Sequence, residues 1–302
     1  MYCTVLNSAV VLTVVCVSVL LGALLERFGW TTFAIAQCTK FKSRKPRCRL
    51  VGAGPGDPSL LTRAALQALQ EADLVIADRL ISEDILSLIR GRIILSRKFK
   101  GCANAAQNEL HDWTLDALHK GIDVVRLKGG DPFVYGRGAE EIEIFRNHGF
   151  DVEVIPGVSS SLCAPLAAGI AVTTRGVADQ LLIATGHGMN DSIPREVAPY
   201  YIGRTTVFLM SVSRMHQLMH RLSESGYPDG TPVAVIEKAA TKDQRVVKGV
   251  LAQIADTCVS LNVASPATIV VGKAVYALCQ NDGTSHYQYG KGSVLFSSVS
   301  NL

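Results

Sequence analysis

From residue 47 onward, short apolar runs alternate with segments of helical periodicity. The apolar runs predict strands at Arg49–Val51, Leu74–Ala77, Ile93–Ser96, Asp123–Leu127 and Val152–Ile155. Between them, apolar residues recur at helical spacing, which predicts helices over Leu60–Ala72, Ser82–Ile89, Ala105–His119 and Ala139–His148. This alternation is typical of a mainly parallel sheet with right-handed crossovers. The first half of the chain is therefore predicted to be an α/β domain over residues 48–158.

The pattern breaks at Pro156-Gly157-Val158 and resumes after Arg175. A helix rich in small residues is predicted from Ser160 to Ala168, with later helices at Arg214–Ser225 and Leu251–Val259. Further strands are predicted at Leu181–Thr185, Thr206–Met210, Pro232–Ile236, Arg245–Gly249 and Thr268–Val271. These elements predict a second α/β domain over residues 159–280, followed by a loose polar tail over 281–302.

The N-terminal segment differs from the rest. Ala9–Leu25 is uncharged over 17 residues, and a basic run from Lys40 to Arg49 follows it. A membrane span needs about 20 apolar residues, with roughly 17 as the lower limit. If the segment spans a membrane, the basic run predicts a catalytic body on the cytoplasmic side. Residues 1–47 are thus interpreted either as an anchor and linker or as a buried helix or atypical start of a cytoplasmic protein.

Charge is unevenly distributed along the chain. The whole chain carries +4, and residues 1–50 hold seven Lys or Arg against one Glu, which leaves the remaining 252 residues at −2. A nearly neutral body has no basic field for nucleic acid, so no nucleic-acid partner is expected. The eight cysteines form no C-x-x-C pair, which argues against a zinc site. Their scatter fits reduced thiols in a cytosol-like compartment.

The first candidate ligand site is the glycine-rich turn Val51–Pro58, between a predicted strand and a predicted helix. Glycines allow a backbone to approach a ligand closely. The pattern G-x-G-P-G-D-P departs from the dinucleotide fingerprint G-x-G-x-x-G. Pro55 and Pro58 also remove amide donors that a pyrophosphate would use. The turn favours an uncharged or cationic ligand, the alternative being a tight turn with no ligand.

A second glycine-rich loop, Lys128–Gly138, follows the predicted strand that ends at Leu127. Ligands of open α/β sheets bind at the carboxyl ends of the strands, so both loops are expected to line one crevice. Arg126, Lys128 and Arg137 cluster around the second loop, and guanidinium groups grip carboxylates in bidentate fashion. The crevice therefore suits a polycarboxylate, although each cation taken singly is better explained as a solvated surface charge.

Asp78 and Lys98 each follow a predicted strand and so belong to the same edge of the sheet. A carboxylate there is a candidate general base. From the spacing alone, Asp78 is better interpreted as the N-cap of the next helix, and Lys98 as a surface residue. His187, in Thr185-Gly186-His187-Gly188, is interpreted as a hydrogen-bonded structural histidine rather than a ligand or an acid.

Several of these segments together resemble the uroporphyrinogen-III C-methyltransferase family, which also forms the C-terminal half of bifunctional sirohaem synthases. The matching segments are Gly52–Pro58 with Ala77–Leu80, Arg126–Gly138 with Glu140-Glu141, Pro156-Gly157-Val158, Thr185-Gly186-His187 and Glu237–Gly249. The resemblance covers about residues 48–280, with two long motifs in the same order as in the family. Residues 1–47 are too short for the dehydrogenase–ferrochelatase domain of the bifunctional members, so another protein is expected to perform oxidation and iron insertion.

The resemblance implies the tetrapyrrole-methylase fold, in which two α/β domains hold S-adenosylmethionine in the cleft between them, usually in a homodimer. It implies cofactor contacts from Pro55, Gly129, Gly130, Asp131, Val134, Ser159, Ser160, Met210 and Ala239. Asp78 falls on the family's proposed proton acceptor. Lys98 falls on its proposed proton donor, although the chain between the two is a little shorter here. Many members have Thr-Ala at Ser159-Ser160 and Gly at Ala239, and both changes are small.

The activity that the resemblance implies is C-methylation of uroporphyrinogen III at C2 and C7, giving precorrin-2 for sirohaem or corrinoid synthesis. The candidates for contacts with the substrate's carboxylates are Arg79, Arg126, Lys128 and Arg137. With no Cys/His cluster in the chain, no catalytic metal is expected. The alternatives are a methylase of the same fold acting on another precorrin, a nicotinamide-dependent dehydrogenase, and an inactive membrane-tethered relative with a scaffold role.

Overall fold

Two five-stranded sheets form the framework of the computed structural model, which describes residues 45–96, 103–186 and 196–278. Within these ranges, the helices are all too short or too polar to traverse a bilayer. The predictions made for Ala9–Leu25, Lys98, His187 and residues 281–302 fall outside the described residues.

The first sheet is entirely parallel, as the sequence predicts. Its strands are β1 (Cys48–Gly52), β2 (Leu74–Ala77), β3 (Arg92–Leu95), β4 (Val124–Lys128) and β5 (Val152–Ile155). They lie in the order β3-β2-β4-β1-β5, and Gly52 at the end of β1 stands opposite Lys128 at the end of β4. This register places the two glycine-rich loops side by side at the carboxyl edge of the sheet.

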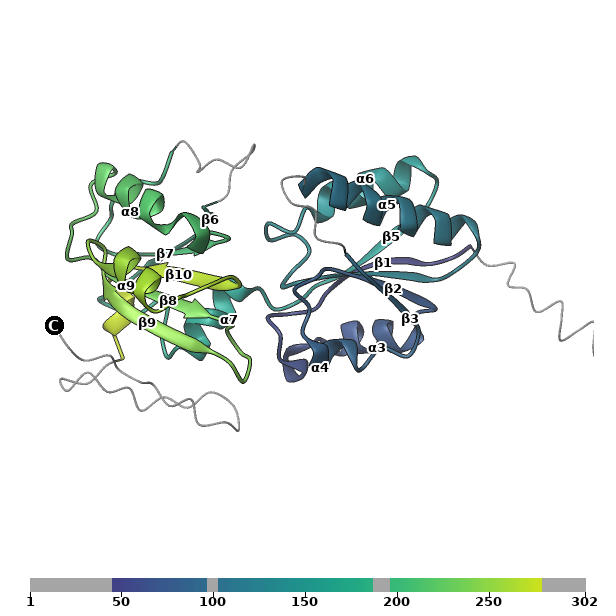
Figure 1. Cartoon of the computed structure of the whole chain (residues 1–302), viewed down its shortest axis with the longest axis horizontal. Helices are drawn as coiled ribbons and strands as arrows, with labels where there is room; N and C mark the ends of the chain where they lie inside the picture. Colours follow the sequence, from purple (N-terminus) through teal and green to yellow (C-terminus); the bar gives the residue numbers. More distant parts are fainter. Residues whose placement is uncertain (1–44, 97–102, 187–195, 279–302) are drawn as a thin grey trace, which may run out of the picture. The chain divides into compact units, whose positions relative to one another are not determined.

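Helices cover both faces of this sheet (Figure 1). One face packs against α3 (Arg63–Glu71) and α4 (Glu83–Leu86), and the other against α5 (Ala103–His119) and α6 (Gly138–Asn147). Successive residues of a strand point to opposite faces. On β4, Val125 and Leu127 accordingly belong to the cluster under α3 and α4, whereas Val124 belongs to the cluster under α5 and α6.

Two helix starts differ from the sequence-based prediction because side chains cap them. The helix expected from Leu60 is divided into a 3-10 turn, η1 (Pro58–Leu60), and α3, whose N-cap Thr62 accepts a hydrogen bond from the Ala65 N–H. Ser82 caps α4 by accepting from the Ile85 N–H. A hydroxyl at the N-cap satisfies an amide that has no partner inside the helix. Asp78 is therefore not the cap of α4, and its carboxylate has another partner, described below.

The second sheet is mixed, which the alternation of strands and helices did not reveal. It contains β6 (Gln180–Thr185), β7 (Arg204–Leu209), β8 (Pro232–Glu237), β9 (Arg245–Val250) and β10 (Ala267–Val271). In the order β6-β7-β10-β8-β9, only β6 and β7 pair in parallel. The seven residues between β8 and β9 form no helix. Parallel neighbours need a longer crossover connection, so this short loop makes the two strands antiparallel.

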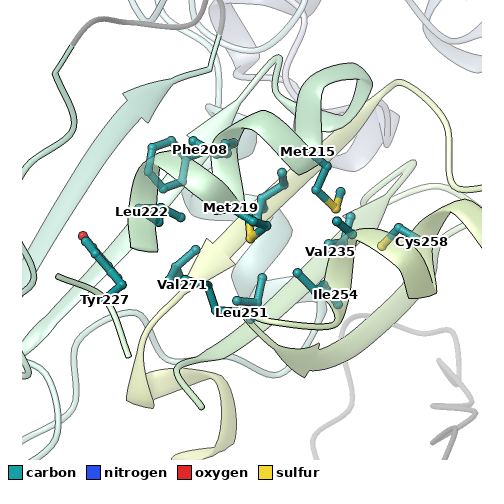
Figure 2. Packing of buried hydrophobic residues seen from close by; sticks show 14 residues of the cluster. Phe208, Met215, Met219, Leu222, Tyr227, Val235, Leu251, Ile254, Cys258 and Val271 are labelled. Atoms are coloured by element: carbon teal, nitrogen blue, oxygen red, sulfur yellow. The ribbon is translucent and has the colours of Figure 1, made fainter. Parts of the chain in front are cut away.

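The second sheet is also covered on both faces. Figure 2 shows the larger cluster, in which Phe208, Val235 and Val271 of the strands meet apolar side chains of α8 (Met215–Glu224) and α9 (Ile254–Ser260). The opposite face packs against α7 (Ser160–Ala167) and η4 (Lys273–Tyr276). The sequence predicted helices that begin at Arg214 and Leu251, whereas α8 begins at Met215 and α9 at Ile254. A 3-10 turn, η3 (Val212–Arg214), precedes α8.

The described cysteines are expected to resist alkylation in the folded protein. Cys48, Cys163 and Cys258 are buried. Burial raises the pKa of Cys48 to about 12 and that of Cys258 to about 11. Only about one Cys258 in a thousand would be thiolate at pH 8, and the thiolate is the reactive form. Peptide mapping after iodoacetamide treatment should find Cys48 and Cys258 unmodified in the native protein and modified in guanidinium chloride. Fast native labelling of either would contradict the burial described here.

Candidate functional site

Three strand-end loops meet at Gly52, Gly130 and Gly157 with their backbones in contact. A Cβ on Gly157 would lie 2.2 Å from the Gly130 carbonyl oxygen, and a Cβ on Gly52 would lie 2.5 Å from the Gly157 nitrogen. Gly54 and Gly130 also exchange backbone hydrogen bonds of 3.1 and 2.8 Å. Only glycine fits this approach, since any side chain would overlap main-chain atoms that cannot turn aside. The first and second glycine-rich loops therefore form one continuous surface, as the sequence predicts.

Asp131 joins two of these loops. One of its carboxylate oxygens accepts a hydrogen bond of 2.8 Å from the Phe133 N–H, and the other accepts one of 3.2 Å from the Gly157 N–H. Hydrogen bonds from amides to a carboxylate are charge-assisted and stronger than neutral ones. Asp131 thus holds the loop after β4 against the loop after β5.

A cavity of about 1470 Å³ lies at these loops and is lined by residues of both α/β domains. The residues that the family resemblance placed at the cofactor all line it: Pro55, Gly129, Gly130, Asp131, Val134, Ser159, Ser160, Met210 and Ala239. They come from five separate segments of the chain. The structure therefore brings into one place the residues that the family resemblance implied as cofactor contacts.

The second sheet contributes loops with unusual backbone conformations to this cavity. Met210 follows β7 with φ of 56°, while Lys238 and Ala240 follow β8 with φ of 47° and 57°. Residues other than glycine seldom have positive φ, and such strain gathers at binding sites that the surrounding structure holds in place. Met210 is half exposed, at 48%, and Ala239 is buried between the two strained residues. The loops after β7 and β8 are accordingly shaped for contact with a ligand.

Asp78 is one of the carboxylates that the first domain presents to the cavity. It follows β2, its side chain is 35% exposed, and it lines the cavity wall. One terminal nitrogen of Arg126 donates to its Oδ1 at 2.5 Å. The carboxylate, for which the family resemblance implies a functional role, is thus both held by a cation and open to the cavity.

Arg126 and Lys128 are placed differently from the sequence-based expectation. Both lie on β4 beneath α6, with the Arg126 side chain 0% and the Lys128 side chain 4% exposed, and neither lines the cavity. The Lys128 ammonium donates to Glu141, and the Arg126 Nε lies 3.3 Å from the Glu141 Oε2. Burying a charge is costly unless it is paired within the protein. The two cations therefore compensate carboxylates of this chain and do not face a substrate.

Gln107 and His111 of α5 complete the buried polar cluster. The Gln107 amide donates to the Glu141 Oε1 and lies 3.1 Å from the His111 Nε2. Burial lowers the pKa of His111, the Glu141 charge acts in the opposite direction, and the cations Arg126 and Lys128 add to the lowering. His111 is thus a neutral member of the cluster at pH 7.

The other predicted substrate contacts divide between the cavity and its surroundings. Arg79 is exposed and lines the cavity. Arg137 does not line it: its guanidinium pairs with Glu140 at 2.6 Å, and these hydrogen bonds lower the pKa of Glu140. Lys98 and His187 lie outside the described residues. Cavity residues that the sequence analysis missed include Lys238 and Lys242, and for Lys238 the available signal was its position near the end of a predicted strand.

Among the described residues, the cavity lining carries more negative than positive charge. Six of these residues are carboxylates and three are cations: Asp57, Asp78, Glu83, Asp84, Asp131 and Asp243 against Arg79, Lys238 and Lys242. A concave surface with this excess attracts a cationic ligand and disfavours a pyrophosphate. The described residues contain no group of three or more His, Cys, Asp or Glu side chains arranged to hold a metal ion.

Known proteins are similar in sequence to this chain over most of its length. A family model described as Tetrapyrrole (Corrin/Porphyrin) Methylases matches residues 47–255. The probable uroporphyrinogen-III C-methyltransferase of Schizosaccharomyces pombe is 45% identical over 225 residues, which cover 74% of this chain and 45% of the relative. The uroporphyrinogen-III C-methyltransferase of Methanocaldococcus jannaschii is 41% identical, with 76% and 96% covered. The chain thus spans about half the length of the first relative and nearly all of the second.

Solved structures of such enzymes share the fold. The native uroporphyrin-III C-methyltransferase of Thermus thermophilus is 35% identical, with a TM-score of 0.68 and coverage of 78% of this chain and 96% of that one. A structure of the Thermus enzyme complexed with S-adenosylhomocysteine matches equally well. A cobalt precorrin-4 methyltransferase is 26% identical with a TM-score of 0.66, over 76% of this chain and 95% of that one. The tetrapyrrole-methylase fold predicted from the sequence is confirmed by these likenesses.

Proposed function

Because this chain belongs to the tetrapyrrole (corrin/porphyrin) methylases, we propose that it transfers methyl groups from S-adenosylmethionine to uroporphyrinogen III. Transfer at C2 and C7 would give precorrin-2, a precursor for sirohaem or corrinoids. One observation carries the proposal: the nine positions assigned to the cofactor line a single cavity together with the Asp78 carboxylate. Relatives named as uroporphyrinogen-III C-methyltransferases support the choice of substrate.

The cavity suits S-adenosylmethionine, whose sulfonium carries a positive charge. The excess of carboxylates in the lining favours such a cation. The glycine-rich loops allow the backbone to approach an adenosine closely. A nicotinamide dinucleotide fits less well, because its pyrophosphate would meet these carboxylates and a turn in which Pro55 and Pro58 lack amide donors. The dehydrogenase alternative is therefore not favoured.

In the proposed reaction, the protein orients its reactants and handles a proton. S-adenosylmethionine supplies an activated methyl group when bound, so alignment with the accepting pyrrole carbon contributes more than acid–base chemistry to the transfer itself. The methylated ring must then lose a proton. Asp78, half exposed and held by Arg126, is the proposed acceptor, directly or through a water. Lys98 remains the proposed proton donor.

The substrate's carboxylates need cations at the cavity. Arg79, Lys238 and Lys242 line it and are exposed, so we assign them this role. Arg137 could join them by exchanging its contact with Glu140 for one with the substrate. Arg126 and Lys128 are not assigned to bind the substrate's carboxylates, because their charged groups are buried and paired within the protein.

Another precorrin is the second candidate substrate. The likeness to a cobalt precorrin-4 methyltransferase, at a TM-score of 0.66, shows that the same fold serves other tetrapyrroles. The 45% and 41% identities to uroporphyrinogen-III enzymes exceed the 26% to this one and favour the first candidate. We also propose a homodimer, which the family resemblance implies, and a cytoplasmic location, which the scattered cysteines favour, with or without an anchor at residues 9–25.

The first experiment is anaerobic incubation of the full chain with uroporphyrinogen III and S-adenosylmethionine, followed by mass spectrometry of the tetrapyrrole. We expect a product heavier by two methyl groups, and none without the methyl donor. Isothermal calorimetry with S-adenosylhomocysteine is run on the same sample. Binding without methylation would keep the fold's cofactor site and move the search to other tetrapyrroles. A folded protein that binds no cofactor would refute the methyltransferase proposal.

A further inference from the structure

A buried ion-pair chain runs from the interior of the first domain to the cavity. Glu141, in the first turn of α6, contacts Arg126, and Arg126 in turn contacts Asp78. Glu141 and Arg126 are fully buried, and only Asp78 is open to the cavity. Through this ion-pair chain, Glu141 can influence chemistry in the cavity by way of Arg126, apart from its contact with Gln107, which also lines the cavity.

Arg126 is held on three sides. One terminal nitrogen donates to Asp78 at 2.5 Å, while the other donates to the carbonyls of Ile76 at 3.2 Å and Leu127 at 3.1 Å. The third side is the Nε, which faces the Glu141 Oε2 at 3.3 Å but makes no hydrogen bond there. A guanidinium is planar, so these contacts fix its orientation and with it the position of the nitrogen that holds Asp78.

Glu141 is itself firmly placed. Its Oε1 accepts from the Lys128 ammonium and from the Gln107 amide. It also lies at the N-terminal end of a ten-residue helix, where the backbone dipole stabilises a carboxylate. Charge balance adds to this placement, since Arg126 and Lys128 together face two carboxylates, Asp78 and Glu141. Without Glu141, the buried guanidinium would lose one counter-charge and one of its three contacts.

We infer that Glu141 is a positioning residue for the methyl-transfer reaction, which acts by holding Arg126 so that the Asp78 carboxylate keeps its place at the cavity wall. Glu141 contacts neither substrate nor cofactor in this scheme. The inference rests on the proposed function, because it assigns Asp78 a part in turnover. It goes beyond the sequence motif, in which Glu140 and Glu141 are equivalent neighbours, because only Glu141 is buried against Arg126 while Glu140 pairs with Arg137 at the surface.

The test compares Glu141→Asp and Glu141→Gln with wild type and with each change combined with Asp78→Asn. Glu141→Asp keeps the charge and shortens the reach, so it is the variant expected to fold if Glu141→Gln does not. Displacement of a catalytic group by about 1 Å can slow a reaction by up to about 100-fold. We expect Glu141→Asp to lower kcat at least about tenfold, with KM for both substrates and the Kd of S-adenosylhomocysteine changed less than about twofold.

The double variants separate positioning from a general loss of structure. If Glu141 acts through Asp78, its replacement should change kcat less than about twofold once Asp78 is already Asn, because effects within one network are not additive. Glu143→Gln is the matched control, an exposed carboxylate on the same helix, and should keep wild-type kcat. A full additional loss in the Asp78→Asn background, or wild-type kcat in Glu141→Asp, would overturn the inference alone. A wild-type chain that transfers no methyl group would overturn the proposed function and the inference with it.

Discussion

Replacing Asp78 with Asn is expected to lower kcat by about 10²- to 10⁴-fold, the range that removal of a general base produces. Asn is nearly isosteric with Asp, and its side-chain oxygen can still accept a hydrogen bond from Arg126. The variant therefore keeps the contact that measures 2.5 Å in the wild-type protein. What the amide lacks is the ability to take up a proton from the methylated ring. The Kd of S-adenosylhomocysteine, measured by calorimetry, should change less than about twofold, because that ligand needs no proton transfer.

A control variant and the affinity for the cofactor product distinguish a catalytic from a structural role of Asp78. Asp112→Asn removes an exposed carboxylate from α5 and should leave both kcat and the Kd unchanged. Equal losses of turnover and cofactor affinity in Asp78→Asn would show that the residue is structural. That result would fit its bond to Arg126 but would leave the proton acceptor of the reaction unassigned.

The edge of the first sheet was accessible to sequence reasoning because its determinants are local. Apolar runs followed by Gly, Pro or Asp mark the ends of parallel strands, and the ends of such strands meet at one edge. This rule predicts that both glycine-rich loops and Asp78 lie together. The nine cofactor positions came from the family resemblance, and the structure adds that all of them line one cavity.

The buried charges were missed because their partners are distant in the sequence. In the sequence, Arg126 is a single cation within an apolar run, which is typical of a surface residue. Its burial depends on Asp78 and Glu141, which come from other elements. One signal was available: Glu141 and Phe145 are four residues apart, so they share a helix face, and Phe145 is fully buried. A carboxylate on an apolar helix face needs a buried cation, and β4 beneath it carries two.

Strand direction in the second sheet was also beyond the local pattern. Periodicity identifies a strand but does not give its orientation, which depends on the connection that precedes it. Between β8 and β9 the decisive fact is the length and conformation of the loop Lys238–Gln244. That same loop lines the cavity and contains the strained residues Lys238 and Ala240. The loop that makes β8 and β9 antiparallel is thus also part of the site.

The contact of three backbones at Gly157 leads to the largest stability effect that we expect. In Gly157→Ala, the new Cβ would lie 2.2 Å from the Gly130 carbonyl oxygen and 2.8 Å from the Gly52 Cα. Main-chain atoms cannot rotate away, so β1 and the loop after β4 must move apart. Overpacking costs about 1–3 kcal/mol at sites where side chains can adjust, and we expect about 3 kcal/mol or more here. The melting temperature should fall by about 6–12 °C.

The same displacement should weaken the cofactor site, which distinguishes this glycine from one that serves folding alone. Gly130 lines the cavity and Asp131 accepts from the Gly157 N–H, so separating these loops moves the cavity wall itself. We expect the Kd of S-adenosylhomocysteine to rise at least about tenfold at a temperature where the variant is still folded. A loss of about 1.4 kcal/mol in binding free energy is enough to raise the Kd tenfold. Gly230→Ala is the matched control, because its Cβ meets no atom within 4 Å. A Gly157→Ala protein with both the melting temperature and the affinity of Gly230→Ala would show that the three loops do not meet as described.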